Sequence, residues 1–264
     1  MGKKMAYSVY TPPNWQPEER LPLLLLLHGA RDDETTFDRY QVGEFLDSQI
    51  NGALLPRVIV LSPDGGLGFW ENWHDGSRLY RDWVIKDLLP NVQARYNTLG
   101  CPQHCFATGM SMGGHGAIRF AYYQPGVFSS VAAISAPIIS KQEAQAAPSL
   151  RTFFIRLIVP VKKIWGDLDG DHLPEDLDPY ISWVEKKALK NVRLMLAWGD
   201  KESDRIIESN KRFSAHLGQH GRAHQALQFS GGHAWSFWKP VIAESIKFHL
   251  TQKPLAEQPA HNGL

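Results

Sequence analysis

The sequence predicts an α/β fold with a mostly parallel central sheet and helices on both of its faces. Short apolar runs alternate with longer segments of helical period, which is the pattern of consecutive β-α-β units. The densest run, LPLLLLLH at Leu21–His28, is typical of a strand buried on both faces of a parallel sheet. A length of 264 residues suits one large α/β domain.

Each element follows from the local pattern, taken in chain order. Apolar runs mark the expected strands, which are Ala6–Tyr10, Leu23–His28, Val58–Ser62, His104–Thr108, Ser130–Ile134, Val192–Ala197 and Ala226–Phe229. Segments of helical period mark the expected helices, which are Asp38–Ile50, Arg81–Tyr96, Met112–Tyr123, Asp204–Leu217 and Trp235–Leu250. The alternation of the two kinds of element predicts parallel pairing through most of the sheet.

Two stretches depart from this alternation. Four prolines interrupt short helical patterns between residues 138 and 190, so we expect an irregular insertion over the sheet there. Residues 252–264 offer little apolar surface to bury and are expected to be a disordered tail. The prediction is therefore a single domain over residues 1–251.

Charge and composition favour a small neutral ligand. The formal net charge is +1 and basic and acidic residues are scattered along the chain, which does not predict a nucleic-acid surface. The apolar run at Leu21–His28 is far shorter than the roughly 20 residues that a membrane span needs. We therefore expect neither a nucleic-acid nor a membrane partner, and the sequence does not predict an oligomeric state.

The N-terminal residues and the cysteines bear on location. The first residues carry basic side chains but no apolar segment or cleavage pattern of a signal peptide, so a cytoplasmic location is expected. Cys101 and Cys105 have no second pair that would complete a zinc site. They are expected to be two free thiols, and no metal is expected.

The stretch GMSMGG, residues 109–114, has the spacing of a nucleophile elbow. It lies between an apolar strand and a segment with apolar residues at helical spacing, so Ser111 is expected at a strand-to-helix junction. Gly109 and Gly113 leave room where strand and helix approach each other. A glycine-rich turn with an incidental serine is the plain alternative, but this context favours a nucleophile. A phosphate-binding loop is disfavoured because no lysine follows the glycines.

A nucleophilic serine needs a base and an acid, and in folds with such an elbow they follow in the order Ser, Asp or Glu, His. His233 stands after the last expected strand and before the last helix, whereas His115 lies inside the elbow helix and is expected to pack or face solvent. The acid is open at this point, because the loop after the strand Val192–Ala197 offers three carboxylates. These are Asp200, Glu202 and Asp204.

An oxyanion hole requires two backbone N–H groups directed at one oxygen atom. Met112, directly after the serine, is expected to supply one. Ala30 is expected to supply the other, because Gly29 permits a sharp turn after the strand Leu23–His28.

With these motifs in place, the chain resembles the esterase D-type branch of the α/β-hydrolases, especially the tributyrin esterase-like proteins. The resemblance runs from Val9 to Leu250 and includes LLLLLHG, SPDGG, GMSMGGHGAIRFA, DRIIESNKRF and GGHAWSFW. It implies hydrolysis of carboxylic esters or thioesters without a cofactor. The catalytic set that it implies is Ser111, His233 and Asp204, with Ala30 and Met112 as oxyanion donors.

The resemblance favours Asp204 because related acids stand six residues before an asparagine such as Asn210. The turn between Gly199 and Asp204 is about two residues longer than usual, which keeps Asp200 in consideration. The aromatic residues Trp70, Trp73, Trp235 and Trp238 are expected to line the substrate pocket, and a position in the core is the alternative for such residues.

The leading hypothesis is a serine carboxylesterase that acts on short-chain esters through an acyl-enzyme. The alternatives are a thioesterase of the S-formylglutathione hydrolase type, whose motifs are similar, and an acyltransferase on the same fold. An inactive hydrolase-like binding module is a third alternative, which the presence of nucleophile, base and acid disfavours.

Overall fold

The computed structural model describes residues 4–146, 159–166 and 178–251. Seven strands form one sheet in the order β1-β3-β2-β4-β5-β6-β7, in which only β1 runs antiparallel to its neighbour. Their bounds are β1 Tyr7–Tyr10, β2 Leu23–Leu27, β3 Ile59–Pro63, β4 Cys105–Met110, β5 Ser130–Ile134, β6 Arg193–Gly199 and β7 Gln225–Phe229. This confirms the predicted α/β fold and its mostly parallel sheet.

The register brings the ends of four strands together at one edge of the sheet. Leu27, the last residue of β2, pairs with Gly109 of β4, and Met110 at the end of β4 pairs with Ile134 of β5. Ile134 in turn pairs with Ala197 of β6. Because parallel strands end at the same edge, the loops after β2, β4, β5 and β6 lie side by side, as expected for a ligand site in an open α/β sheet.

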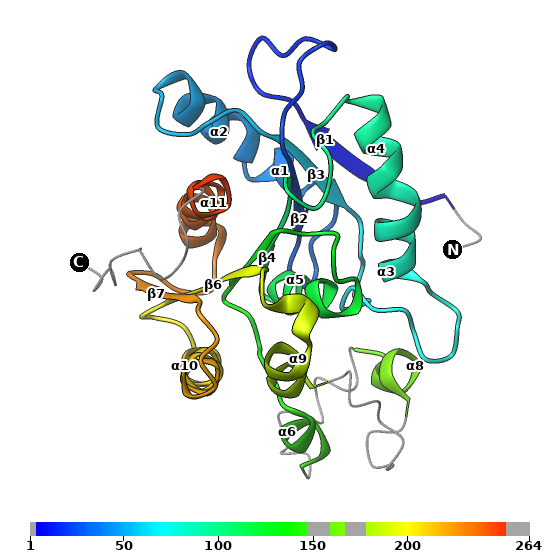
Figure 1. Ribbon diagram of the computed structural model, residues 1–264, viewed down its shortest axis with the longest axis vertical. Coiled ribbons are helices and arrows are strands. Elements are labelled where there is room, and N and C mark those ends of the chain that lie inside the picture. The colour runs from blue at the N-terminus through cyan, green and yellow to red at the C-terminus, as the bar shows by residue number, and fades with distance from the viewer. Residues whose placement is uncertain (1–3, 147–158, 167–177, 252–264) are drawn as a thin grey trace.

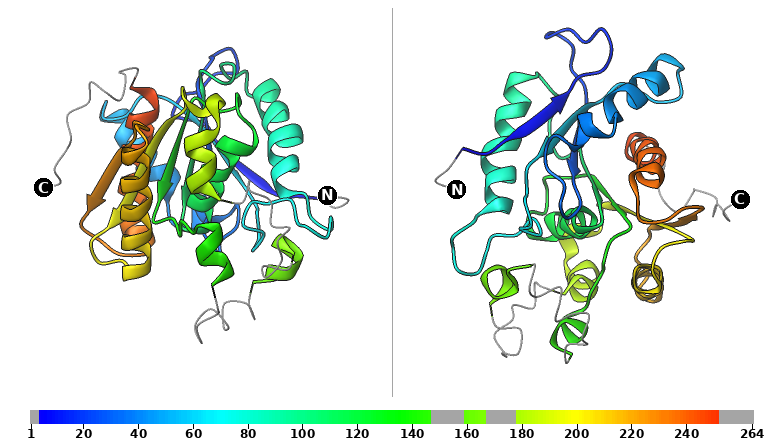
Figure 2. Two further views of the ribbon diagram at one scale, coloured as in Figure 1. Left: turned by 60° about the horizontal axis from the view of Figure 1, so that its bottom comes forward. Right: turned by 180° about the vertical axis from the view of Figure 1, so that it is seen from behind.

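Helices cover both faces of the sheet (Figures 1 and 2). One face carries α1 Thr36–Arg39, α2 Val42–Asn51 and α11 Trp235–Leu250. The other carries α3 Tyr80–Asp82, the π-helical η1 Trp83–Leu88, α4 Leu89–Arg95, α5 Met112–Tyr123, α9 Pro179–Glu185 and α10 Asp204–Gln219. Alternate leucines of β2 point into these two apolar layers, because successive side chains of a strand face opposite sides.

Two helices differ from the expected ones for local reasons. The segment expected as one helix, Asp38–Ile50, is split into α1 and α2 because Gln41 has a φ of 53°, a left-handed conformation that an α-helix does not contain. The segment Arg81–Tyr96 is helical but widens into a π-helical stretch before Pro90. A proline cannot donate a hydrogen bond to the preceding turn and its ring crowds that turn.

The predicted irregular insertion is described only in part. Its described elements are α6 Lys141–Gln145, α8 Val161–Trp165, α9 and the 3-10 helix η3 Lys187–Leu189. The expected tail at 252–264 lies outside the described residues. The single-domain organisation stays a prediction.

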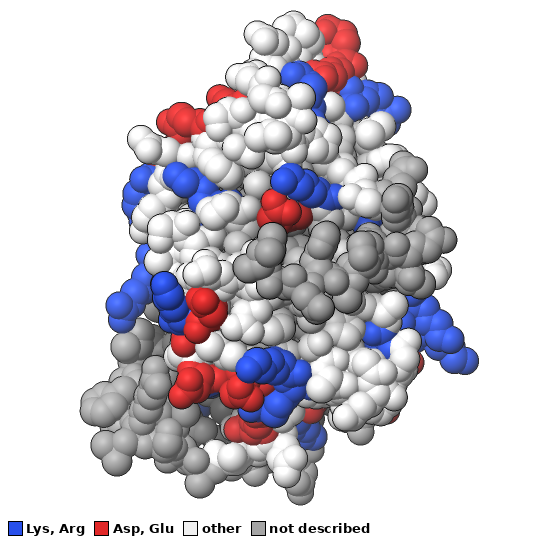
Figure 3. All heavy atoms as spheres, turned by 90° about the vertical axis from the view of Figure 1, so that its left-hand side faces the viewer, with Lys and Arg blue, Asp and Glu red and all other residues white. Residues whose placement is uncertain are grey.

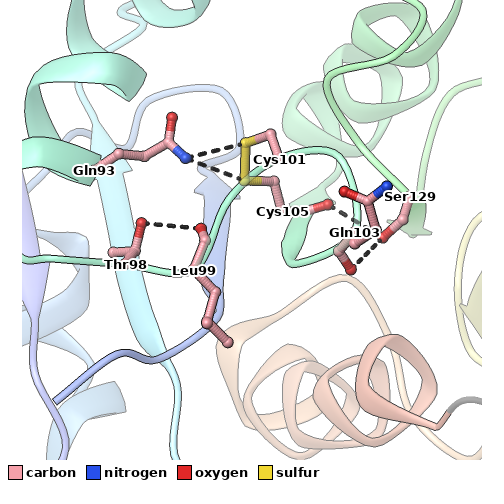
Figure 4. Close-up of a disulfide and its surroundings, with 7 residues drawn as sticks. All are labelled: Gln93, Thr98, Leu99, Cys101, Gln103, Cys105 and Ser129. Carbon is pink, nitrogen blue, oxygen red and sulfur yellow. Dashed lines mark hydrogen bonds between the residues drawn. A yellow bond between two sulfur atoms is a disulfide. The ribbon is translucent and has the colours of Figure 1, made fainter.

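The prediction of two free thiols is wrong, because Cys101 and Cys105 form a disulfide. It closes the loop that leads into β4, and the amide of Gln93 in α4 reaches toward both sulfur atoms at 3.4 and 3.7 Å (Figure 4). Spacing alone could not distinguish this bond from two thiols, since the loop conformation decides whether the side chains meet.

Charged side chains of both signs lie intermixed on the face seen in Figure 3, and neither sign forms a large patch there. That no nucleic acid binds this protein stays a prediction. Within the described part of the chain, no helix combines the length and the apolar character needed to cross a membrane.

Candidate active site

Ser111 stands at a sharp turn between β4 and α5, as the sequence predicts. Its φ of 54° and ψ of −118° belong to a region that non-glycine residues rarely adopt. A Cβ atom added to Gly109 would lie 2.0 Å from the carbonyl oxygen of Gly113, and one added to Gly113 would lie 2.0 Å from that of Leu27. The two glycines are therefore required for the close packing that holds Ser111 in this turn.

His233 contacts Ser111 directly. Its Nε2 atom lies 2.9 Å from Ser111 Oγ, and the imidazole is partly exposed to solvent. The loop that carries it is joined to the loop after β6, because Lys201 N–H donates to the carbonyl of Gly231 and Gly231 N–H donates to the carboxylate of Asp200. These bonds fix the path of the chain just before His233.

The carboxylate that contacts His233 belongs to Glu202. Its Oε2 atom lies 2.6 Å from His233 Nδ1 and its side chain is fully buried. A carboxylate that is ionised can only accept, so His233 Nδ1–H donates to it. The remaining nitrogen, Nε2, is then free to accept from the hydroxyl of Ser111.

This geometry corrects the expectation that Asp204 contacts the imidazole. Asp204 is the first residue of α10 and is exposed, and its side chain lies where a carboxylate interacts favourably with the helix N-terminus. Asp200, the alternative candidate for the acid, instead accepts a hydrogen bond from Gly231 N–H at 2.9 Å. The longer turn noted in the sequence places Glu202 between them, and this residue reaches inward.

The loop after β2 lies against Ser111. A Cβ atom on Gly29 would be 3.4 Å from Ser111 Cβ. Met112 begins α5, and the first N–H groups of an α-helix have no acceptor inside the helix. Of the two residues predicted to supply oxyanion donors, Met112 directly follows Ser111, and Ala30 directly follows Gly29 in the loop that lies against Ser111.

Buried His28 fixes the orientation of the peptide between Gly29 and Ala30. Its Nδ1 lies 2.7 Å from the carbonyl oxygen of Gly29 and must donate, while its Nε2 accepts from Gly65 N–H at 2.9 Å. Burial lowers the pKa of His28, consistent with this neutral form. Because C=O and N–H point in opposite directions across a trans peptide, the N–H of Ala30 points away from His28.

Three of the tryptophans predicted to line the pocket have different surroundings. Trp70 is only 1% exposed and packs edge-on against His28, with 4.9 Å between ring centroids, so the prediction for this residue is corrected to a core position. Trp73 is half-buried beside Tyr80. Trp235 donates to Asp32 Oδ2 at 3.2 Å and thus joins the loop after β2 to the start of α11.

His115 is buried and bonded on both sides, rather than part of the site. Its Nδ1 faces the carbonyl of Pro137 and its Nε2 faces Arg119. Burial, together with the charge of Arg119, lowers the pKa of His115 to about 3. It is thus a packed neutral histidine, one of the two surroundings expected from its place in the elbow helix.

The residues that the structure describes contain no group of three His, Cys, Asp or Glu side chains able to hold a metal ion. That the reaction needs no metal or cofactor stays a prediction.

Two relatives found by sequence comparison are esterases. An esterase of Mycobacterium tuberculosis is 24% identical over an alignment of 258 residues, which covers 89% of this chain and 54% of that protein. The chain thus spans about half the length of this relative. The acetyl esterase of Caldicellulosiruptor saccharolyticus is 20% identical over 236 residues, covering 87% of this chain and 84% of that one.

Solved structures with the same architecture include hydrolases. A ferulic acid esterase superposes with a TM-score of 0.74 at 21% identity, covering 94% of this chain and 92% of its own. The S-formylglutathione hydrolase FrmB of Staphylococcus aureus gives 0.71 at 21% identity, covering 94% and 100%. These likenesses show an α/β-hydrolase fold. The family model described as "Putative esterase" matches residues 1–249, and the chain therefore belongs to that esterase family.

Proposed function

We propose that this protein is a serine carboxylesterase with the triad Ser111, His233 and Glu202. The observation that carries the proposal is the continuous line of contacts from Ser111 Oγ through both imidazole nitrogens to a buried carboxylate. A nucleophile, a base and an orienting acid in this geometry are what acyl transfer to serine requires. Membership of an esterase family supports the same reaction.

In this mechanism Ser111 Oγ attacks the carbonyl carbon of the ester while its proton passes to His233 Nε2. The N–H groups of Ala30 and Met112 stabilise the oxygen that becomes negative. The imidazolium then gives its proton to the departing alkoxide, which leaves as an alcohol. Water repeats the sequence on the acyl-enzyme, releasing the carboxylic acid and restoring the hydroxyl of Ser111.

The proposed substrates are small neutral esters with short acyl chains. The nearly balanced charge of the chain and the likeness to an acetyl esterase support this class. Trp73 and Trp235 are proposed to contact the substrate, and Trp235 is well placed because it is bonded to the loop that carries Ala30. A series of p-nitrophenyl esters of increasing acyl length, compared with S-formylglutathione, distinguishes this from the thioesterase alternative.

Ser111→Ala tests the nucleophile. We expect at least a ~10³-fold loss of kcat, because the triad acts as a unit, and no labelling by a fluorophosphonate probe. The wild-type protein should be labelled at Ser111, as read from the mass of the modified peptide. Labelling at another serine, or turnover retained in the purified variant, would exclude the proposed triad.

Glu202→Gln and Asp204→Asn form a matched pair that tests the acid. An amide at 202 no longer stabilises the imidazolium and can hold the imidazole in the wrong tautomer, so kcat should fall at least ~10²-fold with little change in KM. Asp204→Asn should leave kcat near normal and lower stability by at most about 1 kcal/mol, through its place at the helix N-terminus. The reverse pattern would return the role to Asp204.

We also propose an oxidising compartment as the place where the protein works. A cytoplasmic location is the expectation from the sequence, but the disulfide between Cys101 and Cys105 supports a different one. Reducing systems of the cytosol keep most thiols unpaired, whereas disulfides persist outside it.

A further inference from the structure

The second oxygen of Glu202 has its own buried partner. While Oε2 faces His233, Oε1 accepts a hydrogen bond from the hydroxyl of Ser135. Ser135 is itself fully buried. The indole Nε1 of Trp238 lies 2.9 Å from the same hydroxyl oxygen. The Glu202 carboxylate is therefore held by two hydrogen bonds. Of the two partners, only His233 belongs to the proposed triad.

The chemistry of the three groups fixes the direction of these bonds. An indole N–H can only donate, and an ionised carboxylate can only accept. Trp238 must therefore donate to Ser135 Oγ, and the single proton of that hydroxyl is directed to Glu202. The arrangement leaves no freedom for the hydroxyl to rotate without losing a buried hydrogen bond, which is costly.

The backbone places Ser135 between the nucleophile and the acid. Ser135 directly follows β5 and its N–H donates to the carbonyl of Ala197 in β6, at 2.8 Å. Its neighbour Ile134 accepts from the N–H of Ser111, also at 2.8 Å. Ser135 has a φ of 52°, a conformation that glycine adopts more easily. A serine there retains a hydroxyl at the cost of some backbone strain.

A glutamate acid needs such support more than an aspartate does. The Glu side chain has one more rotatable bond, so holding its carboxylate in one position costs more conformational entropy. The loop that carries Glu202 also lies outside the sheet ladder. A contact from the rigid end of β5 supplies the missing constraint.

We propose that Ser135, oriented by Trp238, is a positioning residue that holds the Glu202 carboxylate against His233. This inference rests on the proposed triad. Ser135 does not touch the substrate, and it acts on the rate only through Glu202 and the imidazole.

Ser135→Ala is the first test. We expect kcat to fall about tenfold to a hundredfold, the range for losing a hydrogen bond to a charged group, with KM changed less than about twofold. The rate of fluorophosphonate labelling at Ser111 should fall by the same factor, because it reports serine reactivity without depending on the ester. Ser135→Gly removes the same hydroxyl while relieving the φ strain, and it should lose activity equally.

A matched control separates positioning from a general loss of packing. Ser245 is another fully buried serine, bonded to Thr108 and to the carbonyl of Ile242 in α11. Ser245→Ala should lower the midpoint of thermal unfolding yet leave kcat and the labelling rate unchanged. Equal losses of activity in Ser245→Ala and Ser135→Ala would overturn the proposal.

A double-mutant cycle locates the effect. In the Glu202→Gln background, Ser135→Ala should change the residual kcat by less than about twofold, because the hydroxyl then has no carboxylate to position. An undiminished effect in that background would overturn the proposal, as would a normal kcat for Ser135→Ala alone. Full activity of Glu202→Gln itself would contradict the proposed triad. This outcome differs from the two that would overturn only the positioning role of Ser135.

Discussion

Ser111, the proposed nucleophile, is held in a backbone conformation that favours glycine. Ser111 has a φ of 54° and a ψ of −118°, and non-glycine residues in such regions cost of the order of 1–3 kcal/mol each. The tight approach of Gly109 to Gly113 shows that the surrounding backbone enforces the turn. Function and stability therefore make opposite demands on this one position.

Ser111→Gly should accordingly be more stable than Ser111→Ala, although both lack the hydroxyl. Glycine relieves the strain of a positive φ, and the gain is reduced by about 0.5–1 kcal/mol from the greater freedom of glycine in the unfolded chain. We expect a net difference of about 1 kcal/mol between the two variants, measured by urea unfolding. Equal stability, or a more stable alanine variant, would mean that the turn is not strained.

Among the elements, α11 is joined to the sheet by a buried polar network. His249, near its C-terminal end, bonds to Ser130 Oγ at 2.7 Å and to Thr108 Oγ1 at 2.9 Å. Its ring also stacks on Phe106. Burial, together with the nearby charge of Arg193, lowers the pKa of His249 well below its ordinary value. The helix is therefore anchored by an imidazole that must stay neutral.

The free energy of unfolding should decrease as the pH falls from 6.5 toward 5. A histidine in the unfolded chain takes up a proton near pH 6.5, whereas the lowered pKa of His249 prevents uptake in the folded protein. The unfolded state then binds more protons, so acid favours it. His28 and His115, whose pKa values are also lowered, act in the same direction. About one pH unit above 6.5 the unfolded histidines are neutral as well, and these groups then contribute no slope.

Each such histidine contributes up to about 1.4 kcal/mol per pH unit in this window. Urea unfolding at several pH values from 7.5 to 5 measures the slope, and His249→Phe should make it shallower because one proton-binding group is gone. A free energy of unfolding that stays constant down to pH 5 would contradict the buried neutral state.

How far each element could be predicted depended on local signals. The bounds of α5 and α11 match the predicted ones, because α5 begins directly after Ser111 and α11 begins directly after the loop that carries His233. The break between α1 and α2 could not be predicted, because glycine is the residue that signals a left-handed turn and position 41 is a glutamine. Propensity does not reveal a conformation that tertiary packing imposes.

At the scale of the whole molecule, the loops that meet at the end of the sheet decide the site. Ser111 and His233 could be predicted because the order of motifs along the chain is informative. The acid could not be predicted in this way. The carbonyl of Gly231, in the loop after β7, accepts a hydrogen bond from Lys201 N–H, and this contact helps to decide which carboxylate of the loop after β6 turns inward. The contact of Ser135 with Glu202 could not be predicted either, because no sequence motif marks this serine.

The disulfide gives a prediction for the molecule as a whole. Cys105 begins β4 and Ser111 follows its last residue, so the two lie about 20 Å apart along the strand. Reduction should therefore leave kcat unchanged. The bond closes a very short loop, and its removal should lower stability by about 2 kcal/mol on the chain-entropy estimate.

Protein isolated from its natural host, with thiols blocked at lysis, should show no reactive thiol before reduction and two afterwards by mass spectrometry. Thermal unfolding with and without reductant then measures the stabilisation. Two blocked thiols in the freshly isolated protein would contradict both the bond and the proposed oxidising compartment. A loss of kcat on reduction would instead show that the constraint at the start of β4 is transmitted to the elbow at its end.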